Sequence, residues 1–502
     1  MTFQNPTVDW AALSPELILL GGAAVILLAA LFLPRGGRRG FSAVVAAGCL
    51  IGAGIAAGIL FDHDTTPSGV VADAIRRDRL AEFAQILLAG SGLLGLGVLW
   101  AEPDDARRER IGEYHALLLT AVAGMSFFVA ANNLMTLFLG LEWFSISLYI
   151  LCAMAPNRLG SLEAALKYLI VGSFGSAILL FGSALVYGAT GSIHFPEIAA
   201  GPADGALLVA GLAMLLVGLG FKMSAAPFHM WTPDVYQGAP TPVTAFMSAA
   251  TKIAALVLTL RVLTTAFPDQ EELWTIALAV IICCSLAVGN LAALVQTDVK
   301  RLLAYSSVSH AGFLLMPVAA GNELGGRALL YYLVSYGAMS IGSFGVVAAR
   351  ERELARPVTL EGMNGFGWER PFHGIAMSVF MLGFIGLPPA GLFLGKFYAF
   401  AALIDRGWTW LAIVGVVATV VSVYYYLGVV RAMWFSAPPL RVTRPRRATA
   451  QPATVRGGAT PRDPVLSTTI ALSLAMTIGA LVGVNPLIDL AENAAEVLSF
   501  PF

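Results

Sequence analysis

The sequence predicts an all-α polytopic membrane protein with about 14 transmembrane helices and two inverted five-helix repeats, each containing one discontinuous helix. Composition carries the class: 58% of the 502 residues are hydrophobic, 12% are charged, and the mean hydropathy is +0.78. In a soluble globular domain, about a quarter of the residues are charged. Since one span needs ~20 apolar residues, the apolar content fills roughly fourteen spans and leaves little for a water-soluble domain.

Apolar runs bounded by charge, proline or glycine mark the individual spans. The expected spans are 17–33, 41–60, 80–100, 113–131, 132–153, 161–188, 205–236, 240–263, 273–295, 300–319, 327–349, 371–403, 408–434 and 464–485. We group them into an N-terminal three-helix segment (1–112), a first five-helix repeat (113–265), a second repeat (271–435), a cytoplasmic linker (436–463) and a C-terminal helix (464–502).

Two of these spans contain helix-breaking residues at their centres. The seventh carries glycines followed by Pro227 and Pro233, and the twelfth carries Gly386, Pro388 and Pro389. Proline removes a backbone donor and glycine loosens a helix, so both spans are expected to be discontinuous. Broken helices of this kind form the binding or conduction elements of many transporters.

An internal repeat relates the two blocks that contain the broken spans. Residues 165–182 align without gaps to residues 328–345, with identities at Ala165/Ala328, Leu166/Leu329, Tyr168/Tyr331, Val171/Val334, Ile178/Ile341, Phe181/Phe344 and Gly182/Gly345. Because each block has an odd number of spans, the second copy enters from the opposite side of the membrane. Inverted repeats are typical of transporters.

Arginine placement predicts the orientation. If Arg35, Arg38 and Arg39 are cytoplasmic, alternation places most other loop arginines on the same side, a bias of roughly three to one. Both termini then lie on the non-cytoplasmic side. The N-terminus lacks a basic n-region, so the first span is expected to be retained. The Pro/Thr/Arg-rich stretch 441–463 is typical of a disordered cytoplasmic linker.

Lysine placement is the strongest functional signal. The chain has five lysines, and four of them, Lys167, Lys222, Lys252 and Lys396, lie inside apolar spans, whereas Lys300 begins one. An intramembrane charge costs at least ~2.5–3.5 kcal/mol and seldom persists without a role. Lysine can lose its proton in an apolar site and arginine cannot, so this pattern favours a proton pathway.

Two further ionisable residues lie inside expected spans. Glu142 is the only acid deep in its helix, which predicts an ion pair with Lys222 or Lys167; the pair could be a proton switch or a purely structural lock. His310 lies on a hydroxyl-rich helix that could hold waters between lysines, although a hydrogen-bonded core histidine is the alternative. Lys167 lies about one turn inside its span, where it can snorkel to the surface.

Several other functions are disfavoured. Cys49, Cys152, Cys283 and Cys284 lack the spacing of a zinc or iron–sulfur ligand set, so we expect no redox centre, metal or cofactor on this chain. The run from Gly90 to Gly95 matches a dinucleotide fingerprint but lies inside an apolar span without a preceding strand. A net charge of −1 disfavours a nucleic-acid partner.

Several motifs resemble subunit N of proton-pumping NADH:quinone oxidoreductase, respiratory complex I, over nearly the whole chain. They are residues 163–168 (EAALKY), 220–222 (GFK) with 231–236 (WTPDVY), 238–246 (GAPTPVTAF), 299–307 (VKRLLAYSS) and 395–398 (GKFY). The antiporter-like superfamily also includes subunits L and M. Subunit N is favoured because Lys396 stands where an M-type chain is expected to carry glutamate, and because no long lateral helix follows span fourteen.

The resemblance implies roles for the buried charges. Glu142 and Lys222 resemble the family's coupling ion pair, Lys252 its central relay, Lys396 its exit-side proton carrier and Lys167 an accessory site. It implies a bacterial-type inner membrane, other membrane-arm subunits as partners, and NADH, flavin, iron–sulfur clusters and quinone on partner subunits.

Two alternatives stay open. One is a stand-alone secondary transporter or a subunit of a multisubunit cation/proton antiporter, which would use the broken helices without an NADH-oxidising partner. The other is a passive membrane scaffold, which requires the buried lysines to be replaceable.

Overall fold

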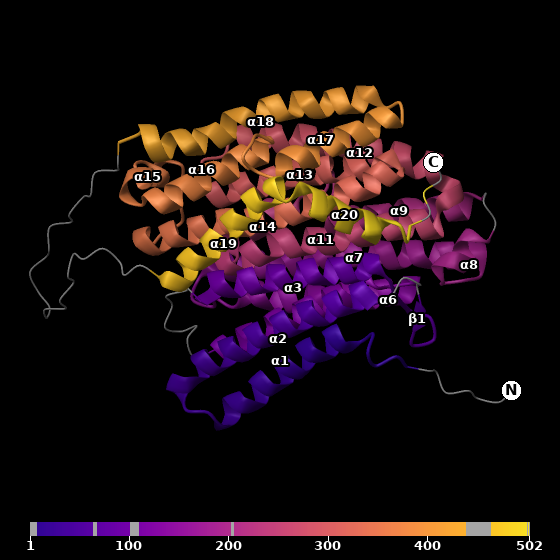
Figure 1. The fold of residues 1–502 in the computed structure, drawn as a ribbon, viewed down its shortest axis with the longest axis horizontal. Helices are drawn as coiled ribbons and strands as arrows, with labels where there is room; N and C mark the ends of the chain where they lie inside the picture. The colour runs from indigo at the N-terminus through magenta and orange to yellow at the C-terminus, as the bar shows by residue number, and fades with distance from the viewer. Residues whose placement is uncertain are drawn as a thin grey trace, which may run out of the picture.

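The computed structural model describes residues 8–63, 68–100, 110–201, 205–437, 463–498 and 500, so most of the expected linker 436–463 lies outside the described residues. The long helices are α1 (Ser14–Phe32), α2 (Arg35–His63), α3 (Arg79–Trp100), α5 (Ile111–Val129), α6 (Leu134–Ala153), α7 (Leu159–Thr190), α11 (Thr241–Ala266), α12 (Glu271–Leu294), α13 (Val299–Ala320), α14 (Glu323–Leu354), α18 (Thr409–Phe435) and α19 (Pro464–Val482). They form the helical bundle of Figure 1.

Shorter elements complete the described fold. They are α8 (Phe195–Ala199), α9 (Ala206–Lys222), α10 (Trp231–Gly238), α15 (Phe366–Glu369), α16 (Pro371–Ile385), α17 (Leu392–Asp405), α20 (Val484–Ala495), the 3-10 turns η1 (Pro268–Gln270) and η2 (Glu361–Met363), and the antiparallel hairpin of β1 (Ser68–Val70) and β2 (Ile75–Arg77). The hairpin was not expected from the sequence.

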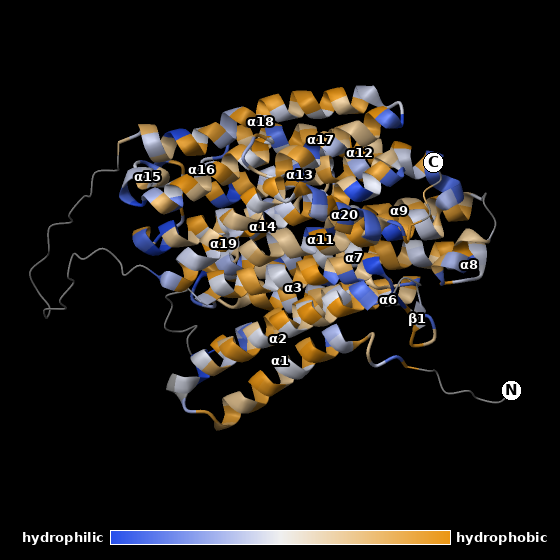
Figure 2. Cartoon of the chain, viewed as in Figure 1, coloured by the Kyte–Doolittle hydropathy of each residue, from blue (hydrophilic) through white to orange (hydrophobic). Residues whose placement is uncertain are grey.

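The helical membrane class is confirmed. Within the described residues, 12 helices are long and apolar enough to cross a membrane. The expected spans 205–236 and 371–403 are each divided, into α9 with α10 and into α16 with α17, as their glycines and prolines predict. Figure 2 shows apolar residues along the helix bodies and polar residues gathered toward their ends. The count of fourteen stays a prediction.

Helices α7 and α14 are longer than expected, at 32 residues each. At 1.5 Å per residue each is about 48 Å long, well beyond a hydrocarbon core of about 30 Å. Backbone hydrogen bonding therefore continues outside the apolar layer, where hydropathy no longer marks the helix.

Equivalent backbone contacts occur in the two blocks. The N–H of Leu134, at the start of α6, donates to Ile193 O after α7 (2.9 Å), and the N–H of Val299, at the start of α13, donates to Val358 O after α14 (2.9 Å). In both blocks the second helix is thus tied to the loop after the third. These contacts support the predicted repeat.

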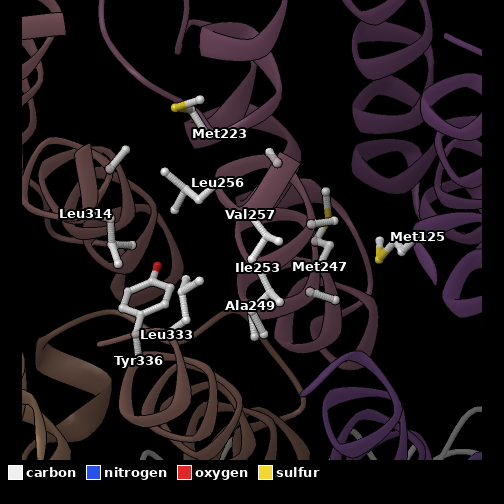
Figure 3. Packing of buried hydrophobic residues seen from close by; sticks show 14 of the residues in the cluster. Met125, Met223, Met247, Ala249, Ile253, Leu256, Val257, Leu314, Leu333 and Tyr336 are labelled. Carbon is white, nitrogen blue, oxygen red and sulfur yellow. The ribbon is translucent and has the colours of Figure 1, made fainter. Parts of the chain in front are cut away.

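Helix α11 lies at the centre of the bundle. Its whole apolar window is buried, whereas α1, α2, α18 and α19 are mostly exposed on their outer sides. Figure 3 shows Ala249, Ile253 and Val257 of α11 packed among side chains of neighbouring helices, including Leu333 and Tyr336. A side chain on α11 that is not apolar therefore has no route to water except through the protein.

The two described chain ends lie on the same side of the bundle. Asp9 pairs with Arg77 (3.4 Å) and Glu496 pairs with Arg79 (4.0 Å), so both ends meet the start of α3. This agrees with termini on a common side. Which side faces the cytoplasm stays a prediction.

A buried ion pair joins the N-terminal helices to α11. The guanidinium of Arg261 donates two hydrogen bonds to the carboxylate of Asp78 (2.5 and 2.6 Å), and both side chains are at most 1% exposed. Asp78 also accepts the backbone N–H of Ala81 in the first turn of α3 (2.9 Å). Arg76 lies farther from the same carboxylate (3.5 Å), so Arg261 is the close partner of Asp78.

We predict that Arg261→Met lowers the free energy of unfolding by about 3–5 kcal/mol, because the buried Asp78 carboxylate loses both guanidinium hydrogen bonds and keeps only the longer contact with Arg76. The matched control is Arg327→Met, since Arg327 pairs with Glu492 at 3.1 Å with both side chains about one-third to one-half exposed. The control should cost under about 1 kcal/mol. Unfolding in mixed detergent–SDS micelles measures both, and equal costs would contradict the assignment.

Candidate functional site

Three lysine ammonium groups lie in the protein core. Lys222 at the end of α9, Lys252 on α11 and Lys396 on α17 are 1%, 0% and 4% exposed. All three lie beside the broken helices. The prolines Pro227, Pro388 and Pro389 explain the breaks, because proline cannot continue a helix. Shortly before them, the backbone turns at Ser224 and Gly386, which adopt left-handed conformations (φ 64° and 95°).

Lys222 is surrounded by uncharged acceptors and aromatic rings. Its Nζ donates to Ser145 Oγ (2.7 Å) and to Tyr168 OH (3.3 Å), and it lies 4.4 Å from the centre of the Phe144 ring. The Ser145 hydroxyl donates in turn to Leu141 O of its own helix. Hydroxyls and ring faces stabilise an ammonium less than a carboxylate does, which leaves its proton available for transfer.

The expected direct ion pair of Glu142 is not formed. No described carboxylate lies within 4.0 Å of Lys222, and Glu142 Oε1 is buried without a hydrogen-bond partner among the described residues. Glu142 precedes Ser145 by one helical turn on α6, and the Ser145 hydroxyl occupies the position beside the ammonium. Glu142 still interacts electrostatically with Lys222.

Lys167 is not the partner of Glu142 either. Its side chain is 43% exposed and pairs with Glu163 (2.7 Å) and Asp234 (2.8 Å). Asp234 of α10 also pairs with Arg301 of α13 (2.6 Å). Lys167 therefore reaches the surface, as its place near the end of the span predicted, and it belongs to a charged cluster that links the two blocks.

Lys252 and Lys396 donate hydrogen bonds to backbone carbonyls at equivalent places in the two broken helices. Lys252 Nζ donates to Met223 O (2.6 Å), and Lys396 Nζ donates to Phe384 O and Ile385 O (3.0 Å each). Met223 and Ile385 each stand at the C-terminal end of the first half of a broken helix, where carbonyls lack intrahelical partners and carry partial negative charge. Each lysine thus fills a site that the helix break creates.

His310 is a further buried ionisable group near these two lysines. It is 1% exposed and interacts electrostatically with both Lys252 and Lys396. Its Nδ1 lies 3.0 Å from Tyr332 OH and its Nε2 lies 3.2 Å from Tyr426 OH. The sequence indicated hydroxyls on the histidine's own helix, but its contacts are tyrosines of α14 and α18.

Lys300 is the buried lysine that sequence reasoning missed. The sequence places it at the start of a span, where a lysine usually reaches water. In the structure it is 3% exposed, and its Nζ donates to Ala239 O (2.7 Å) and Thr241 Oγ1 (3.1 Å). The available signal was the rarity of lysine itself, since the chain has thirty Lys and Arg but few lysines.

In the described part of the chain, the possible metal ligands are His, Cys, Asp and Glu side chains. There, no group of three or more His, Cys, Asp or Glu side chains is arranged to hold a metal ion, and the four cysteines are free thiols. The arrangement instead offers a row of groups that can gain and lose protons.

Comparison with known proteins decides the family. The family model described as "NADH:quinone oxidoreductase/Mrp antiporter, TM" matches residues 131–422. NADH-quinone oxidoreductase subunit N of Salinibacter ruber is 43% identical over 393 residues, covering 77% of this chain and 78% of that protein. The Mycobacterium tuberculosis subunit N is 37% identical over 548 residues, covering 99% and 100%.

The chain belongs to the subunit N family of NADH-quinone oxidoreductases. A chain in the structure of respiratory complex I from Thermus thermophilus with bound aureothin has a TM-score of 0.76 and 32% identity, with 94% of this chain and 98% of that chain covered. A chain of the Mrp complex from Dietzia sp. shares the fold of this chain at a TM-score of 0.84 and 21% identity, with 97% of both chains covered.

We predict that Gly386→Ala destabilises the protein by at least ~1–2 kcal/mol, the cost of a left-handed conformation for a residue with a Cβ. The added Cβ would lie 2.8 Å from Lys396 Cδ and push the lysine off its carbonyls. Gly428→Ala on α18 is the control, because its Cβ would meet nothing within 4 Å. It should stabilise the helix by roughly 0.5–1 kcal/mol. Unfolding in mixed micelles checks both, and costs of the same sign would contradict this account.

Proposed function

We propose that this chain is the antiporter-like, proton-translocating membrane-arm subunit N of an NADH-quinone oxidoreductase. It couples quinone reduction in partner subunits to proton movement through Glu142 and the buried lysines. The observation that carries the proposal is the placement of three fully buried lysines against the broken helices in a chain of this family. The chain acts enzymatically as a subunit, and electron transfer takes place on its partners.

The chemistry of the lysine contacts supports proton transfer. Lys222, Lys252 and Lys396 contact hydroxyls, backbone carbonyls and aromatic rings. Such groups bind the ammonium. Because they are uncharged, no buried charge is left unpaired when the lysine loses its proton. A salt-bridged lysine could not lose its proton without leaving a buried carboxylate unpaired.

The order of the groups suggests a path. Lys252 contacts the carbonyl of Met223, the residue next to Lys222, and His310 interacts electrostatically with both Lys252 and Lys396. A proton leaving Lys222 would pass to Lys252 and then, by way of His310 and its tyrosines, to Lys396. Glu142 would control the first step through space, because its charge acts on Lys222 without contact.

The drive for this transfer must come from partners. Moving one charge against 100 mV costs ~2.3 kcal/mol, and this chain offers the path but not the energy. We propose other membrane-arm subunits of the complex as those partners, within a bacterial inner membrane, with both termini on the non-cytoplasmic side. Quinone, NADH, flavin and iron–sulfur clusters belong to the partners.

A multisubunit cation/proton antiporter is the second candidate, favoured by the shared fold with the Mrp complex chain. It differs in needing no NADH. Cation/proton exchange in vesicles without NADH would support it.

We predict that Lys222→Ala abolishes NADH-driven proton uptake in inverted membrane vesicles and slows quinone-linked NADH oxidation by roughly 10²-fold, because the path loses a proton-carrying group. NADH reduction of an artificial acceptor should continue and reports assembly. The control is Ser183→Ala, since the Ser183 hydroxyl is buried but donates to Leu179 O of its own helix (3.0 Å). Normal pumping by assembled Lys222→Ala would refute the path and favour a scaffold.

A further inference from the structure

Lys300 shares the local geometry of the other buried lysines. Its Nζ donates to Ala239 O, the carbonyl at the C-terminal end of α10, the second half of the first broken helix. Lys252 and Lys396 make the same kind of contact at the ends of α9 and α16. Three of the four fully buried lysines therefore lie on the carbonyl end of a broken-helix segment.

A cavity with several charged side chains in its wall reaches Lys300 from the surface. It has a volume of about 780 Å³ and lies between α7, α10, α13 and α14; we call it the vestibule. Its lining includes Ser161, Lys167, Asp234, Lys300, Arg301 and Glu351. Lys167 is 43% exposed and Lys300 is 3% exposed, so the vestibule extends from water to a buried ammonium. Such a cavity delivers water to the inner group.

A hydroxyl connects Lys300 to a carboxylate of the vestibule. Thr241 Oγ1 accepts a hydrogen bond from Lys300 Nζ (3.1 Å) and donates to Glu351 Oε2. When the carboxyl group is protonated and the amine is neutral, the same contacts can run in reverse. The acid O–H bond of Glu351 then breaks as an O–H bond forms at Thr241, while the original Thr241 proton forms an N–H bond on Lys300. The hydroxyl is regenerated.

One buried side chain interacts with both Lys300 and Lys222. Cys152 of α6 is fully buried and interacts electrostatically with both lysines. Ser161, which lines the vestibule, donates to Cys152 O (2.5 Å). Lys300 therefore lines the vestibule and shares one buried neighbour, Cys152, with the first lysine of the proposed path.

We propose that Lys300 is a fourth proton-carrying lysine, which is loaded from the vestibule through Glu351 and Thr241 and passes its proton inward to Lys222. The proposal rests on the proposed function and names its uptake site. The charged groups that line the vestibule around this position include Glu351 and Arg352 of α14, Asp234 of α10, Lys167 of α7 and Arg301 of α13. Cys152 of α6 interacts electrostatically with Lys300 and with Lys222 of α9.

Paired substitutions separate a proton carrier from a structural cation. Lys300→Met removes the charge, and Lys300→Arg keeps a charge and donors but cannot lose a proton. The control is Arg352→Met, which removes the same charge from the vestibule wall, where Arg352 pairs with Asp463 (2.8 Å). All variants are assayed as the assembled complex in inverted vesicles, with artificial-acceptor reduction reporting assembly.

The expected result is a loss of roughly 10²-fold in quinone-linked turnover and proton uptake for both Lys300 variants. Arg352→Met should stay within about a factor of two of the parent. Parental pumping by Lys300→Arg would overturn the proposal, since charge alone would suffice, and so would parental pumping by Lys300→Met.

Two further variants keep the test decisive. If Lys300→Met fails to assemble, Thr241→Val decides, because it keeps the volume and removes the bridging hydroxyl; parental pumping by Thr241→Val would overturn the loading route. Lys222→Ala is run in the same series. Normal pumping by Lys222→Ala refutes the proposed function. If Lys222→Ala does not pump while the Lys300 variants pump like the parent, only this inference is refuted.

Discussion

The contact between a buried ammonium and the open carbonyl end of a broken helix is the constraint on which the site depends. Glycine and proline end α9 and α16 inside the apolar core, where water cannot satisfy the freed carbonyls. Lys252 and Lys396 supply the missing donors. The breaks would be costly without the lysines, and the lysines would be costly without the breaks, so the two features require each other.

This arrangement explains why the cations are lysines and why their partners are neutral. A carbonyl, hydroxyl or ring face holds an ammonium but leaves no stranded charge when the proton departs. Asp78 and Arg261 show the opposite design in the same protein, a fully charged and fully buried pair that fixes α3 to α11. The chain thus uses ion pairs to hold helices together and uncharged contacts where, in the proposed function, protons move.

Much of this could be predicted from the sequence, because hydropathy and helix-breaking residues are local signals. They located the helical spans, both breaks, and the burial of Lys222, Lys252 and Lys396. Side-chain partners were less predictable, since they come from helices distant in the chain. The prediction of a direct Glu142–Lys222 ion pair was wrong, because the Ser145 hydroxyl lies beside the ammonium instead. The contacts of His310 with Tyr332 and Tyr426 depend on helix rotations that hydrophobic periodicity does not define. Lys300 lies in the first turn of a helix, as its place at the start of a span predicted, but hydropathy did not show that neighbouring helices bury this helix end.

The central claim is that the buried lysines act by releasing protons and not merely as cations. The most direct measurement is the number of protons taken up per NADH oxidised by inverted vesicles that carry Lys252→Arg. Arginine keeps the charge and can donate to Met223 O, but it does not deprotonate. The account predicts intact artificial-acceptor reduction with loss of proton uptake. A parental proton-to-NADH ratio in this variant would contradict it.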